Sequence, residues 1–187
     1  MTYSLNDHWL TGAEIVPSPN HSERPADATV ELLIIHNISL PPGEFGGVYV
    51  DQLFCNSLDC DAHSYFHQLR ELRVSSHLLI DRRGRVRQYV PFDKQAWHAG
   101  ESSFAGRTRC NEFSIGIELE GTDEQAFTDQ QYASLEAITR LLMAAYPGIS
   151  RDRIVGHSDV APGRKTDPGP CFDWQRFKQS LPVPESN

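Results

Sequence analysis

The segment FSIGIEL, residues 113–119, alternates apolar side chains with small or polar ones, which predicts a β-strand. One face of this strand carries the apolar members Phe113, Ile115, Ile117 and Leu119. The other face carries Ser114, Gly116 and Glu118. The run VELLII at 30–35 is short, mostly apolar and rich in β-branched residues, which indicates a second, buried strand that ends at His36 and Asn37. A sheet is therefore expected at the centre of the fold.

Helices are expected around this sheet. Thr128-Asp-Gln-Gln opens the clearest one, whose apolar residues recur at helical spacing until Pro147. Shorter elements are predicted as helices at 48–56, 61–70 and 172–181, a hairpin of 75–81 with 86–90, and a strand at 153–155. Helices interspersed with strands predict an α/β fold with one central mixed sheet flanked by helices. The length of 187 residues fits a single domain, 1–187, with a core at about 30–178.

Composition narrows the class of function. Lys and Arg number 17 against 25 Asp and Glu, a net charge of −8, which argues against a nucleic-acid partner. The sequence has no apolar run long enough to cross a membrane and no signal-peptide pattern at its start, so a cytoplasmic location without membrane contact is expected. The spacing of Cys55 and Cys60 leaves a disulfide or half a zinc site open, although free thiols are expected in this compartment.

A dispersed set of polar residues could hold a metal. His36 follows the 30–35 strand, His157 follows the 153–155 strand, and Asp167 comes ten residues later. Two imidazoles and a carboxylate form the ligand set of an open catalytic zinc site. Hydrogen-bonded histidines at strand ends remain the alternative at this stage. Glu118 and Glu120 share a strand face, and either could act as a general base or be a polar strand residue.

Long collinear segments resemble a known family. They are LLIIHNISLPPGEFGG (32–47), LRVSSHLLI (72–80), QYVPFDKQAWHAG (88–100), RCNEFSIGIELEGTD (109–123) and VGHSDVAPGRKTDPGP (155–170). In this order they resemble the zinc-dependent N-acetylmuramoyl-L-alanine amidases of the amidase-2 group, over roughly residues 9–178. More narrowly, the segments resemble the cytoplasmic branch of that group, whose members act on 1,6-anhydro muropeptides. Related phage lysozymes and peptidoglycan-recognition proteins carry a cysteine where Asp167 stands.

The resemblance implies the fold, the cofactor and the site. The fold would be the peptidoglycan-recognition-protein-like fold of that group, with one Zn²⁺ per chain. The metal ligands would be His36, His157 and Asp167, the catalytic glutamate Glu118 rather than Glu120, and the oxyanion-stabilising residue Lys165. The residues expected to contact substrate are Asn37, Arg73, Trp97 and Arg109. His77 and His98 could support the site or contact substrate, or could be structural hydrogen-bonding residues.

The resemblance also implies the reaction. The expected activity is hydrolysis of the amide between the lactyl group of 1,6-anhydro-N-acetylmuramic acid and L-alanine, during peptidoglycan recycling. The expected partner is a small muropeptide, the expected state a monomer, and a role in limiting β-lactamase induction follows from the family. A non-catalytic peptidoglycan-recognition module and an autolysin that attacks intact murein are the alternatives. The complete ligand set, with Glu118 and Lys165, disfavours the first, and the missing signal peptide disfavours the second.

Overall fold

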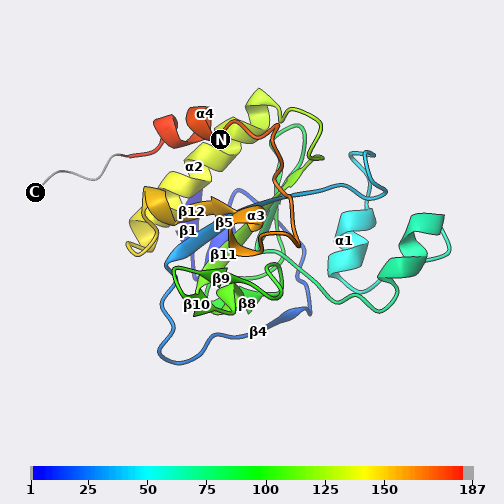
Figure 1. Cartoon of the computed structure of the whole chain (residues 1–187), viewed down its shortest axis with the longest axis horizontal. Helices are drawn as coiled ribbons and strands as arrows, with labels where there is room; N and C mark the ends of the chain where they lie inside the picture. The colour runs from blue at the N-terminus through cyan, green and yellow to red at the C-terminus, as the bar shows by residue number, and fades with distance from the viewer. Residues whose placement is uncertain (1, 183–187) are drawn as a thin grey trace, which may run out of the picture.

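A computed structural model describes residues 2–182 and has one six-stranded sheet at its centre (Figure 1). The strands lie in the order β12 (Ile154–Gly156), β5 (Leu32–Ile38), β11 (Ser114–Glu120), β6 (Leu78–Ile80), β7 (Val86–Gln88) and β3 (Glu14–Ile15). The first four strands in this order are parallel to one another. Strand β7 is antiparallel to β6, and β3 is parallel to β7. The prediction of an α/β fold with a mixed sheet is confirmed.

The two central strands differ from the sequence prediction at their ends. Strand β5 continues to Ile38, so His36 lies within the strand instead of after it. The reason is that β11 pairs with all seven residues of β5, from Ser114↔Leu32 to Glu120↔Ile38. Phe113 does not share the face of Ile115, because it caps a 3-10 turn before β11 and packs on the opposite side of the sheet.

One face of the sheet is covered by α2 (Asp129–Ala145) and α4 (Trp174–Ser180). Thr128 and Gln131 form the capping box that starts α2, as the sequence predicts. The buried apolar stripe of α2 consists of Tyr132, Leu135, Ile138 and Leu142, which pack in one cluster with residues of β5 and β11. Each fully buried Leu or Ile contributes about 1.5–3 kcal/mol, so this layer holds the central strands rigidly in place.

The opposite face of the sheet packs against a short helix, whose Val160 clusters with Leu32 and Ile34 of β5. The short helix α3 (His157–Val160) begins directly after β12. A lobe made of α1 (Tyr49–Phe54) and the 3-10 helix η1 (Ser64–Leu69) stands at the side of the sheet (Figure 1). Three two-stranded pairs complete the fold: β1 (Ser4–Asn6) with β2 (Trp9–Thr11), β4 (His21–Glu23) with β8 (Lys94–Ala96), and β9 (Ser103–Phe104) with β10 (Arg107–Thr108).

The N-terminal segment takes part in the fold. Leu10 is buried in the main core and β3 forms an edge of the sheet, so the packed core begins before residue 30. All four cysteines, at positions 55, 60, 110 and 171, carry free thiols. Within residues 2–182, none of the helices is long and apolar enough to span a membrane.

Candidate metal centre and active site

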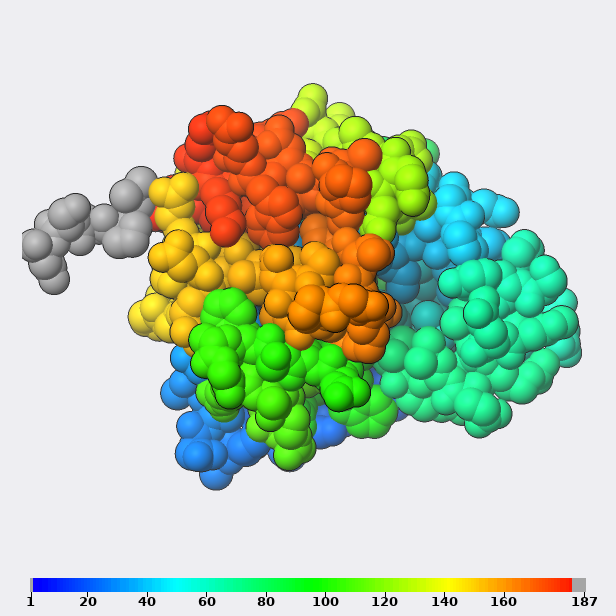
Figure 2. Space-filling view, in the orientation of Figure 1, coloured from blue at the N-terminus to red at the C-terminus, as the bar shows by residue number. Residues whose placement is uncertain are grey.

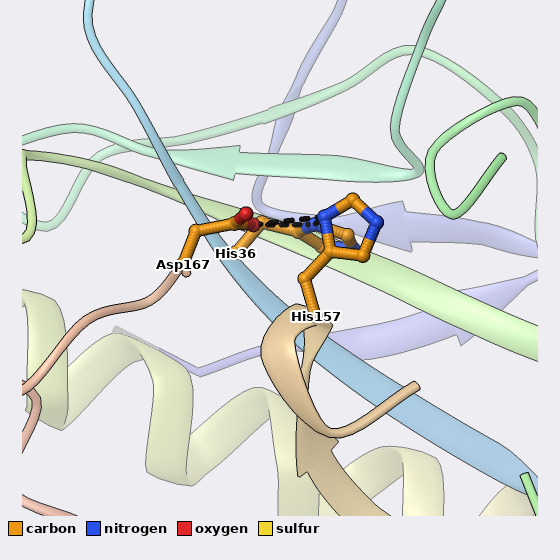
Figure 3. A group of neighbouring side chains, drawn as sticks. All are labelled: His36, His157 and Asp167. Carbon is orange, nitrogen blue, oxygen red and sulfur yellow. Dashed lines mark hydrogen bonds and ion pairs between the residues drawn. The ribbon is translucent and has the colours of Figure 1, made fainter. Parts of the chain in front are cut away.

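Three side chains from separate elements meet at the carboxyl edge of the sheet (Figure 3). His36 comes from β5, His157 is the first residue of α3, and Asp167 lies in the loop that follows. Parallel strands end at the same edge, which is why β5 and β12 bring the two histidines together. The Nδ1 atoms of His36 and His157 lie 3.0 Å apart, and each is 3.0 Å from Oδ2 of Asp167. The three predicted ligands are thus neighbours in space.

The outer nitrogens of the two imidazoles determine what the inner nitrogens offer. His157 Nε2 lies 3.1 Å from the carbonyl oxygen of Ala99, which can only accept, so this nitrogen carries the proton. His36 Nε2 lies 2.9 Å from His98 Nδ1, and His98 Nε2 lies 3.1 Å from Ser114 Oγ. With His36 donating to His98 and His98 donating to Ser114, both inner Nδ1 atoms present lone pairs toward the carboxylate.

Three lone pairs held 3.0 Å apart repel one another unless a cation lies between them. The centre of a triangle with these edges is about 1.7 Å from each corner, so an ion at the usual Zn²⁺ bond length of about 2.1 Å can reach all three atoms. Burial lowers the pKa of His36 to about 4, which keeps this imidazole neutral at pH 7 and ready to bind metal. The donor set, its spacing and its protonation therefore fit a divalent metal such as zinc.

Glu118 and Glu120 have different environments although they share a strand face. Glu120 accepts hydrogen bonds from the backbone N–H of Gly46 at 2.5 Å and of Arg82 at 3.1 Å. Both of its carboxylate oxygens are therefore engaged by the backbone of neighbouring loops. Glu118 is 8% exposed and lines the cavity, and its buried Oε2 has no hydrogen-bond partner among the described residues. Burial, and then the charge of Asp167, raises the pKa of Glu118 well above the ordinary value. Of these two glutamates, Glu118 is therefore the one whose carboxyl group is not engaged in holding the protein backbone.

A cavity of about 830 Å³ opens over this centre. Figure 2 shows the surface hollowed between the loop after α3, in orange, and the η1 lobe, in teal. The three metal-ligand candidates, Glu118 and Lys165 all line the cavity, and the Lys165 side chain is exposed in it. A volume in the range of typical ligand sites, with acidic, basic and imidazole groups converging, is characteristic of an enzyme active site.

Trp97 and Asn37 line the cavity, and both also donate hydrogen bonds to other residues of the chain. The indole N–H of Trp97 donates to Ser22 Oγ at 2.9 Å, which orients the half-buried ring. The amide nitrogen of Asn37 donates to Asp123 Oδ1 at 2.7 Å and to the carbonyl of Pro168 at 3.1 Å. The two donors of Asn37 thus join the loop of Asp167 to Asp123, and only its amide oxygen is left to accept from a substrate N–H.

The two arginines expected to bind substrate lie in different places. Arg73 is exposed at the rim of the cavity, at the end of the η1 lobe. Arg109 lies outside the cavity lining and pairs with Glu112 at 2.8 Å, with its side chain 78% exposed. Sequence reasoning missed Arg164, which lines the cavity and donates to the carbonyls of Ala99 and Glu101. Its position next to Lys165 in the RKTD segment was the available signal.

The structure separates the two histidines whose roles were open. His77 is fully buried, accepts from the N–H of Gly116 at 3.0 Å and contacts the carbonyl of Lys94 at 3.0 Å, so it is a structural residue away from the cavity. Burial lowers its pKa to about 3. His98 lines the cavity and contacts the ligand candidate His36 directly. Its ring occupies the space where a Cβ at Gly116 would lie, which explains the glycine in that strand.

Fold and site together define a member of the N-acetylmuramoyl-L-alanine amidase family: residues 26–170 match this family (Amidase_2), to which the chain belongs. The chain is 59% identical over 174 residues to the 1,6-anhydro-N-acetylmuramyl-L-alanine amidase AmpD of Escherichia coli strain K12, covering 93% of this chain and 94% of that protein. The crystal structure of a Se-Met AmpD derivative superposes with a TM-score of 0.93 at 56% identity, covering 95% and 99% of the two chains.

A more distant solved structure contains a ligand. It is the Escherichia coli N-acetylmuramyl-L-alanine amidase AmiD in complex with anhydro-N-acetylmuramic acid-L-Ala-D-gamma-Glu-L-Lys. It matches at a TM-score of 0.60 and 29% identity, covering 95% of this chain and 65% of that one. The comparison extends the shared fold to a protein whose site holds a muropeptide.

Proposed function

We propose that this chain is a zinc-dependent amidase that hydrolyses the bond between the lactyl group of 1,6-anhydro-N-acetylmuramic acid and L-alanine. The relatives named AmpD are similar over nearly the full length of both chains, which supports the same substrate class here. The observation that carries the proposal is the meeting of His36, His157 and Asp167 in one cavity with Glu118, whose buried Oε2 has no hydrogen-bond partner within residues 2–182. A ligand set next to a buried base is what metal-assisted amide hydrolysis requires.

His36, His157 and Asp167 would hold the zinc ion. When bound, zinc supplies Lewis acidity, which polarises a carbonyl and lowers the pKa of a coordinated water toward about 7. The protein adds the orientation of the two imidazoles, since their outer nitrogens are engaged by His98 and by the Ala99 carbonyl.

Glu118 would move the proton. Its pKa is raised toward neutral pH. A group that acts first as a general base and then as a general acid is most effective when its pKa lies near the working pH. In the reaction the oxygen of water bonds to the lactyl carbonyl carbon and the C–N bond to L-alanine breaks. Glu118 takes the proton of the water and delivers it to the leaving amine, so the carboxylate is regenerated.

Lys165 and the residues at the cavity rim would bind the negative charges of the substrate. The Lys165 ammonium lines the same cavity as Glu118 and can stabilise the negative charge that develops on the carbonyl oxygen. Muropeptide stems carry carboxylates, and Arg73 offers a guanidinium for bidentate binding at the cavity rim. The half-buried Trp97 ring offers an apolar face for the sugar. A local positive rim is needed because the chain as a whole has a charge of −8.

The proposal extends to the cellular role. We place the enzyme in the cytoplasm as a monomer that acts on imported soluble fragments during peptidoglycan recycling, where it would limit β-lactamase induction. A non-catalytic recognition module is disfavoured because a buried, unpartnered Glu118 is costly to the fold unless it serves chemistry.

Purified protein with measured zinc content should be incubated with anhydro-muramyl-tripeptide and, separately, with intact murein. We expect release of free tripeptide from the soluble substrate, loss of release after chelation, and recovery with stoichiometric zinc, all followed by chromatography and mass spectrometry. Faster cleavage of intact murein would favour the autolysin alternative. Stoichiometric binding of the substrate without release of tripeptide would favour the recognition module, and full activity of metal-free protein would overturn the zinc mechanism.

A further inference from the structure

Two consecutive residues contact both histidine ligand candidates from outside. His98 Nδ1 lies 2.9 Å from His36 Nε2, and the carbonyl oxygen of Ala99 lies 3.1 Å from His157 Nε2. The segment 97–100, which follows strand β8, therefore sets the orientation of both imidazoles. A displacement of this backbone would rotate His36 and His157 together.

One side chain holds the backbone of this segment. Oδ1 of Asn111 accepts from the N–H of Ala99 at 2.8 Å and from the N–H of His98 at 3.2 Å. Asn111 lies in the 3-10 turn (Cys110–Glu112) that leads into β11, and its own carbonyl accepts from the half-buried Arg24 guanidinium at 3.0 Å. The oxygen is thus anchored next to the start of β11, and it accepts from the N–H groups of the two residues that contact the histidines.

The other hydrogen bonds of the segment 97–100 involve the backbone of Trp97 and the carbonyl of Ala99. Ser75 pairs with the backbone of Trp97 at its start, with 3.1 Å from the Trp97 N–H to Ser75 Oγ and 3.1 Å from the Ser75 N–H to the Trp97 carbonyl. Arg164 donates to the Ala99 carbonyl at 2.6 Å. These bonds steady the flanks, whereas the N–H groups of His98 and Ala99 are held by Asn111.

We propose that Asn111 is a positioning residue of the metal centre, acting through the backbone of His98 and Ala99 on the rings of His36 and His157. The proposal rests on the zinc site of the proposed function. Groups that orient metal ligands without touching the metal typically change metal affinity by about 10–100-fold when they are replaced. Because Asn111 acts through two peptide units, we expect an effect at the lower end, about 10-fold.

The test is zinc affinity of the whole purified protein, measured by competition with a chromophoric chelator after the metal has been removed. In Asn111→Leu the acceptor oxygen is lost at similar volume, and we expect zinc binding about 10-fold weaker. In Asn111→Asp the acceptor remains, and we expect affinity within about 3-fold of wild type. The visible absorption of the Co²⁺-substituted protein reports ligand geometry, and we expect it to change in the first variant and to be restored in the second.

Gln88→Leu is the matched control, because Gln88 Oε1 likewise accepts from a backbone N–H, that of Leu10, but lies on β7 away from the cavity. We expect it to lower the melting temperature without changing zinc affinity or the Co²⁺ spectrum. If Asn111→Leu does not fold, Asn111→Ala takes its place in the same assay.

Equal zinc affinity of wild type and the folded Asn111→Leu or Asn111→Ala variant would overturn the positioning role and leave the proposed function intact. Equal weakening in Asn111→Asp would overturn it as well, because the acceptor oxygen would then be irrelevant. If wild-type protein itself binds no zinc, the proposed zinc mechanism fails together with this inference.

Discussion

Glu118 on β11 and His36 on β5 are register partners in adjacent parallel strands. Side chains that are paired in register point to the same face of a sheet, so the candidate base and a candidate metal ligand are neighbours through backbone hydrogen bonding alone. The same pairing explains why β5 continues past the apolar run VELLII, since the ladder with β11 is complete up to Glu120. The reactive geometry is therefore built into the rigid centre of the molecule.

Replacing Glu118 by Gln should abolish most of the activity and leave the metal in place. The amide keeps the volume but cannot accept the proton of the attacking water, so we expect kcat to fall by at least about 100-fold with zinc content unchanged. Steady-state kinetics on anhydro-muramyl-tripeptide and metal analysis of the same sample check this. A matched Glu120→Gln variant should keep the zinc and most of kcat, and the reverse ranking would assign the base to Glu120.

The buried carboxyl of Glu118 should make the stability of the metal-free protein depend on pH. Burial raises its pKa in the folded state above that in the unfolded chain, so stability is fully present below the ordinary carboxyl pKa and falls as pH rises toward the raised value. Glu118→Gln lacks this loss, and its stability advantage over wild type should be larger at about pH 7.5 than at about pH 4.5. Urea unfolding in chelator measures it, and an equal difference at both values contradicts the shift.

Replacing Asp167 by Ala should weaken zinc binding while the fold persists. Asp167 contributes the one carboxylate donor of the triangle, and its loss leaves only the two imidazoles as ligands. We expect at least about 100-fold lower zinc affinity, measured by chelator competition. Asp173→Ala, which removes the cap of α4, should lower the melting temperature without changing zinc affinity. Unchanged metal content in Asp167→Ala would remove this residue from the ligand set.

A methyl group at Gly116 should disturb the metal centre through His98. The added Cβ would overlap the His98 ring, which must move and so release His36 Nε2. We expect Gly116→Ala to cost about 1–3 kcal/mol of unfolding free energy and to weaken zinc binding. Gly47→Ala is the control, since its Cβ would meet Tyr49 at an ordinary distance of 3.7 Å. Wild-type affinity in Gly116→Ala would show that the His98 contact does not orient His36.

Replacing Arg73 and replacing Arg109 should have different effects on KM. Arg73 lines the cavity rim, so Arg73→Ala should raise KM for peptide substrates by about 10-fold, the value of one lost charge-assisted contact of 1.4 kcal/mol. Arg109 pairs with Glu112 outside the cavity, so Arg109→Ala should change KM by less than about 3-fold. A larger effect at Arg109 than at Arg73 would mean that substrate extends beyond the described cavity toward β10.

Much of this fold could be predicted because its signals are local. The apolar patterns at 30–35, 113–119 and 128–145 reflect burial in the cores on the two faces of the sheet, and the capping residues of α2 act within one turn. The N-terminal strands were missed because β3 and β4 are short and none of their residues is fully buried, so they carry no apolar pattern. Phe113 was misplaced because a 3-10 turn reversed its side before the strand began.

The sequence by itself determined the α/β class, the family and the identity of the three ligand candidates, since those depend on local pattern and on collinear motifs. The resemblance already selected Glu118 over Glu120, but only the tertiary structure showed the physical difference between them and separated His98 from His77 and Arg73 from Arg109. Residues of each pair have the same chemistry and similar sequence context. They differ in burial and in hydrogen-bond partners from distant segments, such as Gly46 with Glu120 and Ser114 with His98, and those partners meet only when the chain is folded.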